Sequence, residues 1–440
     1  MDFITHLQQA LTQEIPEIME SYTGDNCVKS LSEMEVALKQ MLHELGNDIL
    51  GQWLEAQEQH YPDDCKTCVH CGAEAGYVRR RKGMSITLQG RVYYRRAYYA
   101  CPHCHQGFYP LDERLGIAAG QMSAEVVQLA ALFGIEDAFG TGRDLLQRAT
   151  LLDLSPNSIR KASQQVGQRV VAHEADLYER SQSLETQREQ QRDTVKPQRL
   201  YGSLDGFMVL LEDGWHEMKA GTWWTSTTSR QGETKAENIH YYTDLLPAQD
   251  FSDLVWATGF AHQADQAQEL IFVADGAEWI WNIVQHHYPQ AVQIVDWYHA
   301  CEYIAPVAKV AFNDPLAREH WIHAVKTALW EGQLDKVIAA CQDYVNLEMK
   351  READPAQQAV TYYRNNRQRM DYPTYRAQGY QIGSGTMESG CKRVGLERLK
   401  IAGARWSSEG ARLVAKARAT YLSDDWDKLN SWADTLPQVA

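Results

Sequence analysis

The spacing of hydrophobic and polar positions changes several times along the chain. Apolar residues recur every three or four positions in residues 1–60, which predicts helices there. Residues 61–115 contain β-rich runs such as SITLQG and RVYYRRAYYA, whereas residues 116–180 return to the helical period. Residues 181–198 have almost no apolar side chains and are predicted to be a charged linker or the end of a helix. The pattern therefore predicts four successive segments before residue 199.

From residue 199 the pattern predicts a mixed sheet. The predicted order is three strands, a helix, a strand, a helix and a strand, over residues 199–212, 215–227, 237–246, 249–269, 270–276, 277–288 and 291–299. That order is the one of an RNase H-like fold, in which the first and fourth strands are neighbours. Residues 301–380 are helical in pattern and longer than this fold needs, so we expect an all-α insertion. Residues 381–425 would then complete a core begun by residues 199–300.

Charge is unevenly distributed. The 440 residues carry a formal net charge of −15, and 44% of them are hydrophobic, which excludes wholesale disorder. Residues 1–64 contain 13 acidic and two basic residues, and residues 421–440, which include an acidic tail at 426–440, contain four acidic and one basic. The body between them is nearly neutral, so the overall acidity does not exclude nucleic acid as a partner. The acidic N-terminal helices would serve dimerisation or cover a basic surface until DNA displaces them.

Targeting features are not evident. The first residues lack a basic region followed by a long apolar core, and no run of 18 apolar residues occurs. We therefore expect neither a signal peptide nor a membrane span. Nine cysteines are too few for a disulfide scaffold, and five of them fall between residues 65 and 104, which indicates metal binding in a reducing cytoplasm.

The cysteines form two C-x-x-C knuckles. Such knuckles aim two thiolates each at one ion, which suits a tetrahedral Zn²⁺ site. Cys65 could replace one ligand, and three histidines between residues 70 and 105 are further candidates. With four protein ligands no coordination position stays open, so the ion would be structural. The predicted ligands of this zinc ribbon, over residues 61–115, are Cys68, Cys71, Cys101 and Cys104.

Two segments before residue 199 combine bases with aromatic or amide side chains. Residues 76–100 contain no acid and interleave tyrosines with bases, which suits phosphate contacts, although a solvated ribbon face would have the same composition. Residues 143–170 predict a helix, a turn and a second helix capped by Ser155 and Pro156, a possible DNA-binding hairpin. The predicted DNA contacts in these segments are Arg79, Arg80, Arg81, Lys82, Arg95, Arg96, Arg160 and Lys161.

Three carboxylates are the predicted catalytic centre. Asp205 lies within the first strand of the predicted core, Asp275 ends the fourth, and Glu388 opens a helix after a Gly-Ser-Gly loop. A charged carboxylate at an apolar strand is costly unless it is solvated or bound to metal. Three such groups side by side could hold two Mg²⁺ or Mn²⁺ ions for phosphoryl transfer.

At these residues the sequence resembles the ISKra family of bacterial insertion-sequence transposases, which are of the DDE type and distantly Mutator-like. The resemblance covers roughly residues 65–425 and implies that Asp205, Asp275 and Glu388 are the DDE acids. Asp296 and His299 look like the (C/D)-x-x-H motif of Mutator-like transposases, and both are candidate catalytic residues. The matching segments are CPHC…GFYPLDERLG (101–116), DG (205–206), ADGAEWIWN (274–282), QIVDWYHACEY (293–303), NNRQRMDYPTYRAQGYQIGSGTMES (365–389) and RLKIAGARWSSEGA (398–411).

Further candidates surround these acids. His299 could orient a phosphate or could be a core histidine. Trp297 and Trp406 could stack on an unpaired base, but core packing is the expected role of tryptophan in this chain. Residues 392–418 are rich in bases and follow Glu388, where DNA must enter, so we expect them to face DNA. The bases of this stretch are Lys392, Arg393, Arg398, Lys400, Arg405, Arg412, Lys416 and Arg418.

The resemblance and the residues together predict a transposase acting on double-stranded DNA. The expected fold is α+β multidomain, an RNase H-like core with an all-α insertion, preceded by a zinc ribbon and a helical DNA-binding region. Metal-activated water would cleave the element end, and the freed 3′-OH would attack target DNA. The alternatives are a structure-specific nuclease that never joins ends and a domesticated DNA-binding regulator without chemistry. We expect a cytoplasmic, nucleoid-associated protein that is a dimer or larger when two ends are synapsed.

Overall fold

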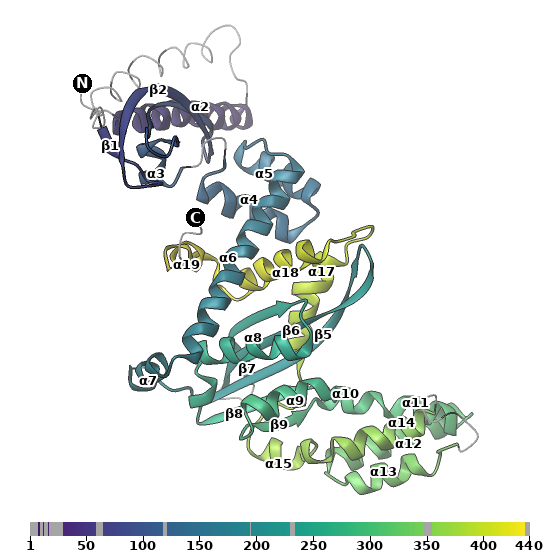
Figure 1. The fold of residues 1–440 in the computed structure, drawn as a ribbon. Coiled ribbons are helices and arrows are strands. Elements are labelled where there is room, and N and C mark those ends of the chain that lie inside the picture. The colour runs from purple at the N-terminus through teal and green to yellow at the C-terminus, as the bar shows by residue number, and fades with distance from the viewer. Residues whose placement is uncertain are drawn as a thin grey trace. The chain divides into compact units, whose positions relative to one another are not determined.

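The computed structural model contains two compact units, residues 1–163 and 164–440, which are described separately (Figure 1). Within the described residues the protein is a mixed α+β structure with helices and two sheets. The structure describes residues 8, 12, 16, 30–58, 65–117, 121–193, 195–228, 234–346, 350 and 354–435. Most of the acidic segment before residue 30 and the last five residues of the acidic tail lie outside this set.

The first unit contains a four-stranded antiparallel sheet in the order β1-β2-β3-β4. Burial alternates along β3, as expected for a strand with one face on a core: Val92 and Tyr94 are buried, whereas Arg91, Tyr93 and Arg95 are exposed. The elements of this unit are α2 (Leu31–Glu58), β1 (Cys65–Thr67), β2 (Glu74–Thr87), β3 (Gly90–Ala100), β4 (Gly107–Phe108), α3 (Pro110–Leu115), α4 (Ala124–Glu136) and α5 (Phe139–Thr150).

A helical hairpin follows the pattern predicted for residues 143–170. Helix α5 ends at Thr150, and Leu151 takes the left-handed conformation at its C-cap with φ of 66°. The backbone N–H of Ser158 donates to the Ser155 hydroxyl, which caps α6 (Pro156–Gln182). Helix α6 crosses from the first unit into the second. The segment predicted to be a charged linker or the end of a helix contains the last residues of α6 and helix α7 (Leu184–Asp193).

The second unit contains a five-stranded mixed sheet in the order β7-β6-β5-β8-β9. Strands β5, β6 and β7 form an antiparallel meander, whereas β8 and β9 run parallel to β5. The short apolar run of β8 suits an inner strand, because β8 lies between β5 and β9 and is parallel to both. The elements are β5 (Arg199–Leu211), β6 (Gly214–Thr228), β7 (Thr234–Asp244), α8 (Ala248–Ala261), η1 (Ala264–Gln266), β8 (Glu269–Ala274), α9 (Glu278–His287) and β9 (Val292–Val295).

The order of strands and helices from residue 199 to residue 295 agrees with the sequence prediction. One face of this sheet packs on α8 and α9. There, the indole of Trp223 contacts the rings of Phe272 and Tyr288, and its N–H donates to the Thr258 hydroxyl at 3.0 Å. This apolar core fixes the sheet that carries the candidate site.

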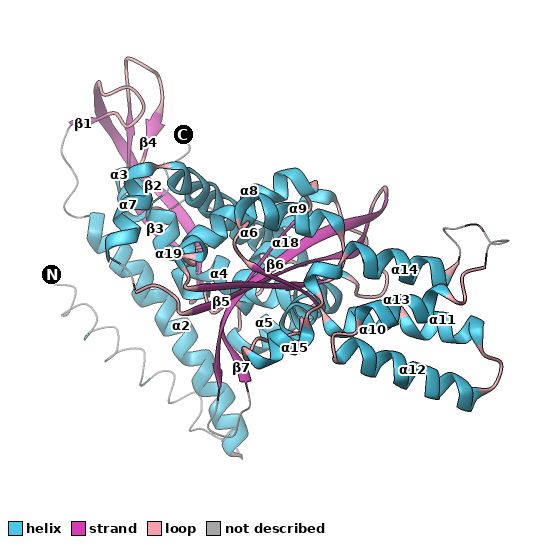
Figure 2. Cartoon of the chain, turned by 90° about the horizontal axis from the view of Figure 1, so that it is seen from below, coloured by secondary structure: helices cyan, strands magenta, loops and turns pink. Residues whose placement is uncertain are grey.

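Helices make up the rest of the second unit in the described residues. In both views α11 to α14 gather to one side of the sheet (Figure 1 and Figure 2). These helices are α10 (Trp297–Glu302), α11 (Ile304–Ala311), α12 (Pro315–Trp330), α13 (Leu334–Gln342), α14 (Pro355–Asn365), η3 (Arg367–Arg369), α15 (Tyr372–Ala377), α16 (Gly385–Gly390), the π-helical η4 (Cys391–Leu396), α17 (Glu397–Leu399), α18 (Ser408–Leu422), η5 (Trp426–Lys428) and α19 (Leu429–Thr435). Among the described helices, none has the length and apolar content that crossing a bilayer requires.

Candidate functional site

The two cysteine knuckles of the first unit have the same local structure. In each, the first cysteine's carbonyl accepts a backbone hydrogen bond from the residue four positions later, Gly72 or His105. Both of those residues have positive φ, 74° and 59°, which closes the turn. The N–H of the same cysteine, Cys68 or Cys101, donates to the carbonyl five positions later. The repeated turn explains how two separate C-x-x-C sequences present their thiols alike.

The four thiols meet at one point. Cys68 and Cys104 lie 3.6 Å apart at their sulfur atoms, as do Cys71 and Cys101, and all four ligand atoms lie within 4.8 Å of one another. Tetrahedral zinc with Zn–S bonds of about 2.3 Å separates its sulfurs by about 3.8 Å, so the cluster could hold a metal such as Zn²⁺. A backbone hydrogen bond from Cys104 lowers the pKa of Cys101, which favours the thiolate that binds metal. The pKa of Cys104 is raised instead, because a backbone hydrogen bond from Gln106 is outweighed by burial and by the other three thiols. Cys65 is not a member of this group.

The basic strands present some of their predicted contacts to solvent and not others. Lys82 and Arg95 are cross-strand partners on the exposed face, and Arg79 and Arg80 are exposed as well. Arg81 is half-buried, with its guanidinium 3.7 Å from the Tyr98 ring centre.

Arg96 corrects the prediction for this surface. It is 2% exposed, and its Nε lies 2.6 Å from the Asp112 carboxylate. Arg96 follows Arg95 directly, and successive strand residues point to opposite faces, so the pair cannot share one surface. On α6, Lys161 is exposed, whereas Arg160 is half-buried and donates to the Asn157 side chain.

In the second unit the sheet register aligns three aspartates. Strands β5 and β8 pair from Arg199–Glu269 to Gly202–Phe272, and continuing this register sets Asp205 level with Asp275. Strands β8 and β9 pair up to Ala274–Val295, so the next pair is Asp275–Asp296. Neighbouring strands lie about 4.8 Å apart. Continued in this way, the register sets the three residues in a row, with Asp205 inside β5 and with Asp275 and Asp296 directly after the last residues of β8 and β9.

Asp205 and Asp275 influence each other electrostatically. Burial raises the pKa of Asp205, and the charge of Asp275 adds to the rise. Burial also raises the pKa of Asp275, with contributions from the charges of Glu217 and Asp296. Each is half-buried, and each caps nearby backbone: Asp205 accepts from the N–H of Gly206, and Asp275 from that of Ala277. Like charges held together in a partly dry site favour a bound cation or a shared proton.

Glu388 lies on α16, which packs against β5 and β6. Glu388 is exposed. Cys391 lies three residues after it, and its thiol donates a hydrogen bond to the Asp205 carboxylate, with 3.4 Å between sulfur and oxygen. Burial raises the pKa of the Cys391 thiol, and the charges of Asp205 and Glu388 raise it further. Cys391 therefore stays protonated and links the helix of Glu388 to the strand of Asp205. It also opens the π-helical η4, a feature frequent at functional sites.

Asp296 is fully buried, and both of its carboxylate oxygens accept hydrogen bonds. One carboxylate oxygen accepts from the backbone N–H of His299, and the other accepts a short hydrogen bond from the N–H of Ser384. Asp296 thus caps α10 and fixes the loop that precedes α16. His299 is half-buried; burial would lower its pKa, but the charges of Asp296, Glu302 and Asp275 raise it overall.

The carboxylates are more widely spaced than the thiols. Among the described residues, only the four cysteines bring three or more possible ligand atoms within 4.8 Å of one another. The charge of Asp275 acts on Asp205, and the charge of Glu388 acts on Cys391, whose thiol donates to the Asp205 carboxylate. Mg²⁺ commonly keeps several water ligands, so a pair of carboxylates can suffice to hold it.

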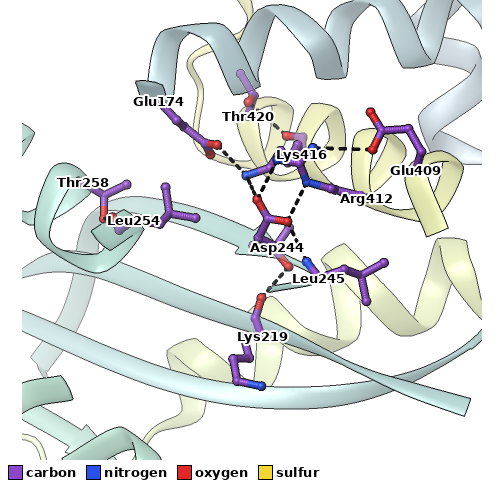
Figure 3. Close-up of polar contacts among 11 residues, drawn as sticks. Glu174, Lys219, Asp244, Leu245, Leu254, Thr258, Glu409, Arg412, Lys416 and Thr420 are labelled. Carbon is purple, nitrogen blue, oxygen red and sulfur yellow. Dashed lines mark hydrogen bonds and ion pairs between the residues drawn. The ribbon is translucent and has the colours of Figure 1, made fainter. Parts of the chain in front are cut away.

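The basic stretch after Glu388 divides into exposed and buried residues. Lys392, Arg393, Lys400 and Arg405 are exposed, as predicted for a DNA-facing surface. For Arg398, Lys416 and Arg418 the prediction is wrong, because each is at most 3% exposed. The Nζ atom of Lys416 lies 2.9 Å from one carboxylate oxygen of Asp244, and the Nε atom of Arg412 lies 2.7 Å from the other (Figure 3). Helical periodicity explains the division, because one face of α18 must pack inward.

The two tryptophans considered for base stacking belong to the core. Trp297 packs edge-on against Trp330 and Tyr372, with ring centres 4.9 and 5.1 Å away. Trp406 is 7% exposed, and its indole N–H donates to the carbonyl of Leu399.

Three residues of the site were not predicted from the sequence. Cys391 follows Glu388 by three positions, and this helical spacing could have placed both on one face. Glu217 on β6 raises the pKa of Asp275 through its charge, and no sequence motif contains it. Ser384 lies inside the Gly-Ser-Gly loop, but its bond to Asp296 is a tertiary contact without a local signal.

Comparison with known proteins places this arrangement in a family. No curated protein matches the chain. A family model described as "Uncharacterised protein family (UPF0236)" matches residues 25–433, which include the cysteine cluster, both sheets and the row of aspartates. Because the match covers most of its length, the chain belongs to the uncharacterised protein family UPF0236.

Proposed function

We propose that this protein is a DDE transposase with an RNase H-like core and an all-α insertion. The observation that supports the proposal is the parallel register of β5 and β8, which, continued by three residues, brings Asp205 in the middle of β5 level with Asp275 directly after β8. The strand order β7-β6-β5-β8-β9 supports it, with the antiparallel meander preceding the parallel strands. The helices between Asp296 and Glu388 correspond to the proposed insertion.

The donor set fits divalent cations. Asp205 and Asp275 offer carboxylate oxygens, which Mg²⁺ and Mn²⁺ prefer. Burial raises the pKa of each, and neighbouring carboxylates raise it further, so a bound cation would stabilise both charged forms. We propose that Asp205, Asp275 and Glu388 hold the cations. When bound, the cations would supply the positive charge that stabilises the attacking and leaving oxygens of phosphoryl transfer.

The chain's own residues would hold and position the DNA. Asp296 would act as a positioning residue, because both its oxygens bond backbone N–H groups and one of them fixes the loop before α16. His299, whose pKa is raised, would orient a phosphate beside Asp275. The exposed bases after Glu388 would contact the DNA backbone, as would the exposed bases of β2 and β3. Two copies would be needed to bring two element ends together.

The proposal is tested with DNA that carries the inverted repeats flanking the gene. The purified chain is incubated with these ends, a target plasmid and Mg²⁺ or Mn²⁺, and both cleaved and joined products are measured. We expect Asp205→Asn, Asp275→Asn and Glu388→Gln each to reduce both products by at least about 10³-fold, because each removes charge needed in the transition state.

A matched control distinguishes loss of chemistry from general damage. Asp213 lies in the exposed turn after β5 and pairs with His216 on the surface, so Asp213→Asn should leave both products unchanged. Full activity of Asp205→Asn would refute the transposase proposal. Cleaved ends without any joined product would instead identify a nuclease.

A further inference from the structure

A large polar cavity begins one residue beyond Asp275. It has a volume of about 970 Å³ and lies between α9 and α14, within the second unit. Its lining includes Gly276, Asn282, Tyr303, Thr361, Tyr362 and Asn366. A cavity of this size can hold a group as large as a nucleotide.

Gly276 brings the cavity wall against the site. A Cβ added at Gly276 would lie 2.2 Å from the Tyr362 ring and 2.9 Å from the Asn366 amide nitrogen. Only glycine therefore allows these side chains to approach the backbone next to Asp275. Tyr303 and Tyr362 are stacked, with ring centres 3.8 Å apart and an interplanar angle of 18°. The charge of Asp275 also acts on both tyrosines, which places the stacked pair near the acids.

The chemistry of the lining favours a planar, uncharged ligand. The Tyr362 hydroxyl is buried and has no hydrogen-bond partner among the residues that the structure describes. Burial raises its pKa, so the hydroxyl stays neutral and can donate. Amide side chains provide further donors and acceptors, whereas the charged lining residues are Glu278 and Arg369. Arg369 is already engaged, because its guanidinium lies over the Trp281 ring and donates to Gln293. A phosphate would find little free positive charge here.

We propose that this cavity is a subsite for an unpaired nucleobase of the DNA held at the acids. Amides and a tyrosine hydroxyl can bond base edges, and tyrosine rings offer stacking surface to any base. The adjacent position of Gly276 places such a base beside the phosphate held by Asp275. This inference rests on the proposed function, which it extends by assigning a site for a base that has left the duplex.

Binding without cleavage tests the subsite. In EDTA, fluorescence anisotropy measures the affinity of the full chain for a terminal-repeat duplex with one unpaired base near the cleavage position, and for the fully paired duplex. We expect the wild type to prefer the unpaired base about tenfold, in line with the stacking of one base on an aromatic ring. Tyr362→Ala and Gly276→Ala should reduce this preference to about onefold, and Tyr362→Phe, which keeps the ring, should reduce it in part.

The control is Tyr421→Ala. Tyr421 is an exposed tyrosine of α18 that packs on Trp426 and does not line the cavity, so its variant should keep the tenfold preference. If Tyr362→Ala fails to fold, Asn282→Ala replaces it, because Asn282 is an exposed lining residue. Equal affinity of the wild type for both duplexes would overturn the subsite.

Two further experiments identify the source of the bound base and distinguish failure of the subsite from failure of the proposed function. Adenosine and thymidine monophosphate are added as competitors; displacement of the DNA at micromolar concentrations would assign the cavity to a free nucleotide and overturn a DNA subsite. Cleavage and joining are measured separately with Mg²⁺. Cleavage without a preference for the unpaired base refutes the subsite alone, whereas the preference without cleavage supports the subsite and refutes the transposase.

Discussion

At the scale of single residues, burial in an ion pair distinguishes lysines and arginines that stabilise the fold from those that could contact DNA. Lys416 is 1% exposed and contacts two carboxylates, Asp244 and Glu174, while Arg412 shares Asp244 (Figure 3). Burial raises the pKa of Glu174, whereas the cations around Asp244 outweigh its burial and hold its pKa below the ordinary value. These charges neutralise one another and connect α6, β7 and α18. They are therefore unavailable to DNA.

Removing the Lys416 cation should lower the free energy of unfolding. Lys416→Met leaves the Asp244 and Glu174 carboxylates under-compensated in a buried site, and breaking a buried pair costs about 3–5 kcal/mol. Urea unfolding followed by circular dichroism measures the loss. The control Lys428→Met removes an exposed lysine paired with Asp425, which should cost less than about 1 kcal/mol. Equal losses in the two variants would contradict the assigned role of Lys416.

The sequence predicted the metal-ligand candidates correctly, but it did not predict which basic residues are exposed. The four thiols were identified because C-x-x-C spacing encodes a local turn, and the structure brings the same four together. Arg96 and Lys416 look like their exposed neighbours in the sequence. Their burial depends on partners far along the chain, Asp112 for Arg96, and Asp244 and Glu174 for Lys416. No local pattern contains that information.

At the scale of elements, the helix of Glu388 is fixed against the sheet by close contacts. A Cβ added at Gly395 in η4 would lie 2.3 Å from the Phe207 ring of β5. Phe207 and Asp205 are two positions apart on one strand, so they face the same side of the sheet. The helix can therefore approach Asp205 only because residue 395 has no side chain.

Gly395→Ala should push this helix away from β5. Overpacking of a buried contact costs about 1–3 kcal/mol, and we expect a matching fall in the free energy of unfolding together with loss of DNA cleavage. Gly385→Ala is the matched control, because among the described residues no atom beyond its chain neighbours and its own helix backbone lies within 4 Å of its Cβ position. Loss of cleavage in Gly385→Ala as well would show that close packing at Gly395 is not the cause.

The elements of the second unit were largely predictable. Alternating and apolar runs identified the five strands and the two helices between them, because each signal is local. The register that sets Asp205 level with Asp275 was not readable from the sequence, since it depends on pairing between strands 70 residues apart. The helical α7 was expected as a linker or helix end because its composition is highly polar.

At the scale of the whole molecule, a group of histidines links stability to pH. His262 and His240 have ring centres 4.6 Å apart, and His173 stacks on Trp432 at 3.9 Å. Burial lowers the pKa of His262 to about 3 and that of His173 to about 4. Asp425 bonds His240, and Lys428 lies near them. The folded chain therefore resists protonation here, whereas the unfolded chain takes up protons near pH 6.5.

Stability should fall as pH falls below about 6.5. A histidine whose pKa is lower in the folded chain than in the unfolded chain stabilises the fold fully above its unfolded pKa. This stabilisation is lost as the pH falls toward its folded pKa. Each such histidine therefore lowers the free energy of unfolding by about 2 kcal/mol between pH 7 and pH 5. Urea unfolding at both values measures this slope. His262→Gln should make the slope shallower, while His320→Gln, at an exposed position, should leave it unchanged. An identical slope in His262→Gln and wild type would contradict the assignment.

The central claim is that Asp205, Asp275 and Glu388 form one cation site. Its most direct test is titration of the full chain with Mn²⁺, with the free ion followed by electron paramagnetic resonance. The wild type should bind Mn²⁺ tightly in the presence of element-end DNA, and Asp205→Asn combined with Asp275→Asn should abolish that binding while Asp213→Asn retains it. Unchanged Mn²⁺ binding in the double variant would contradict the claim.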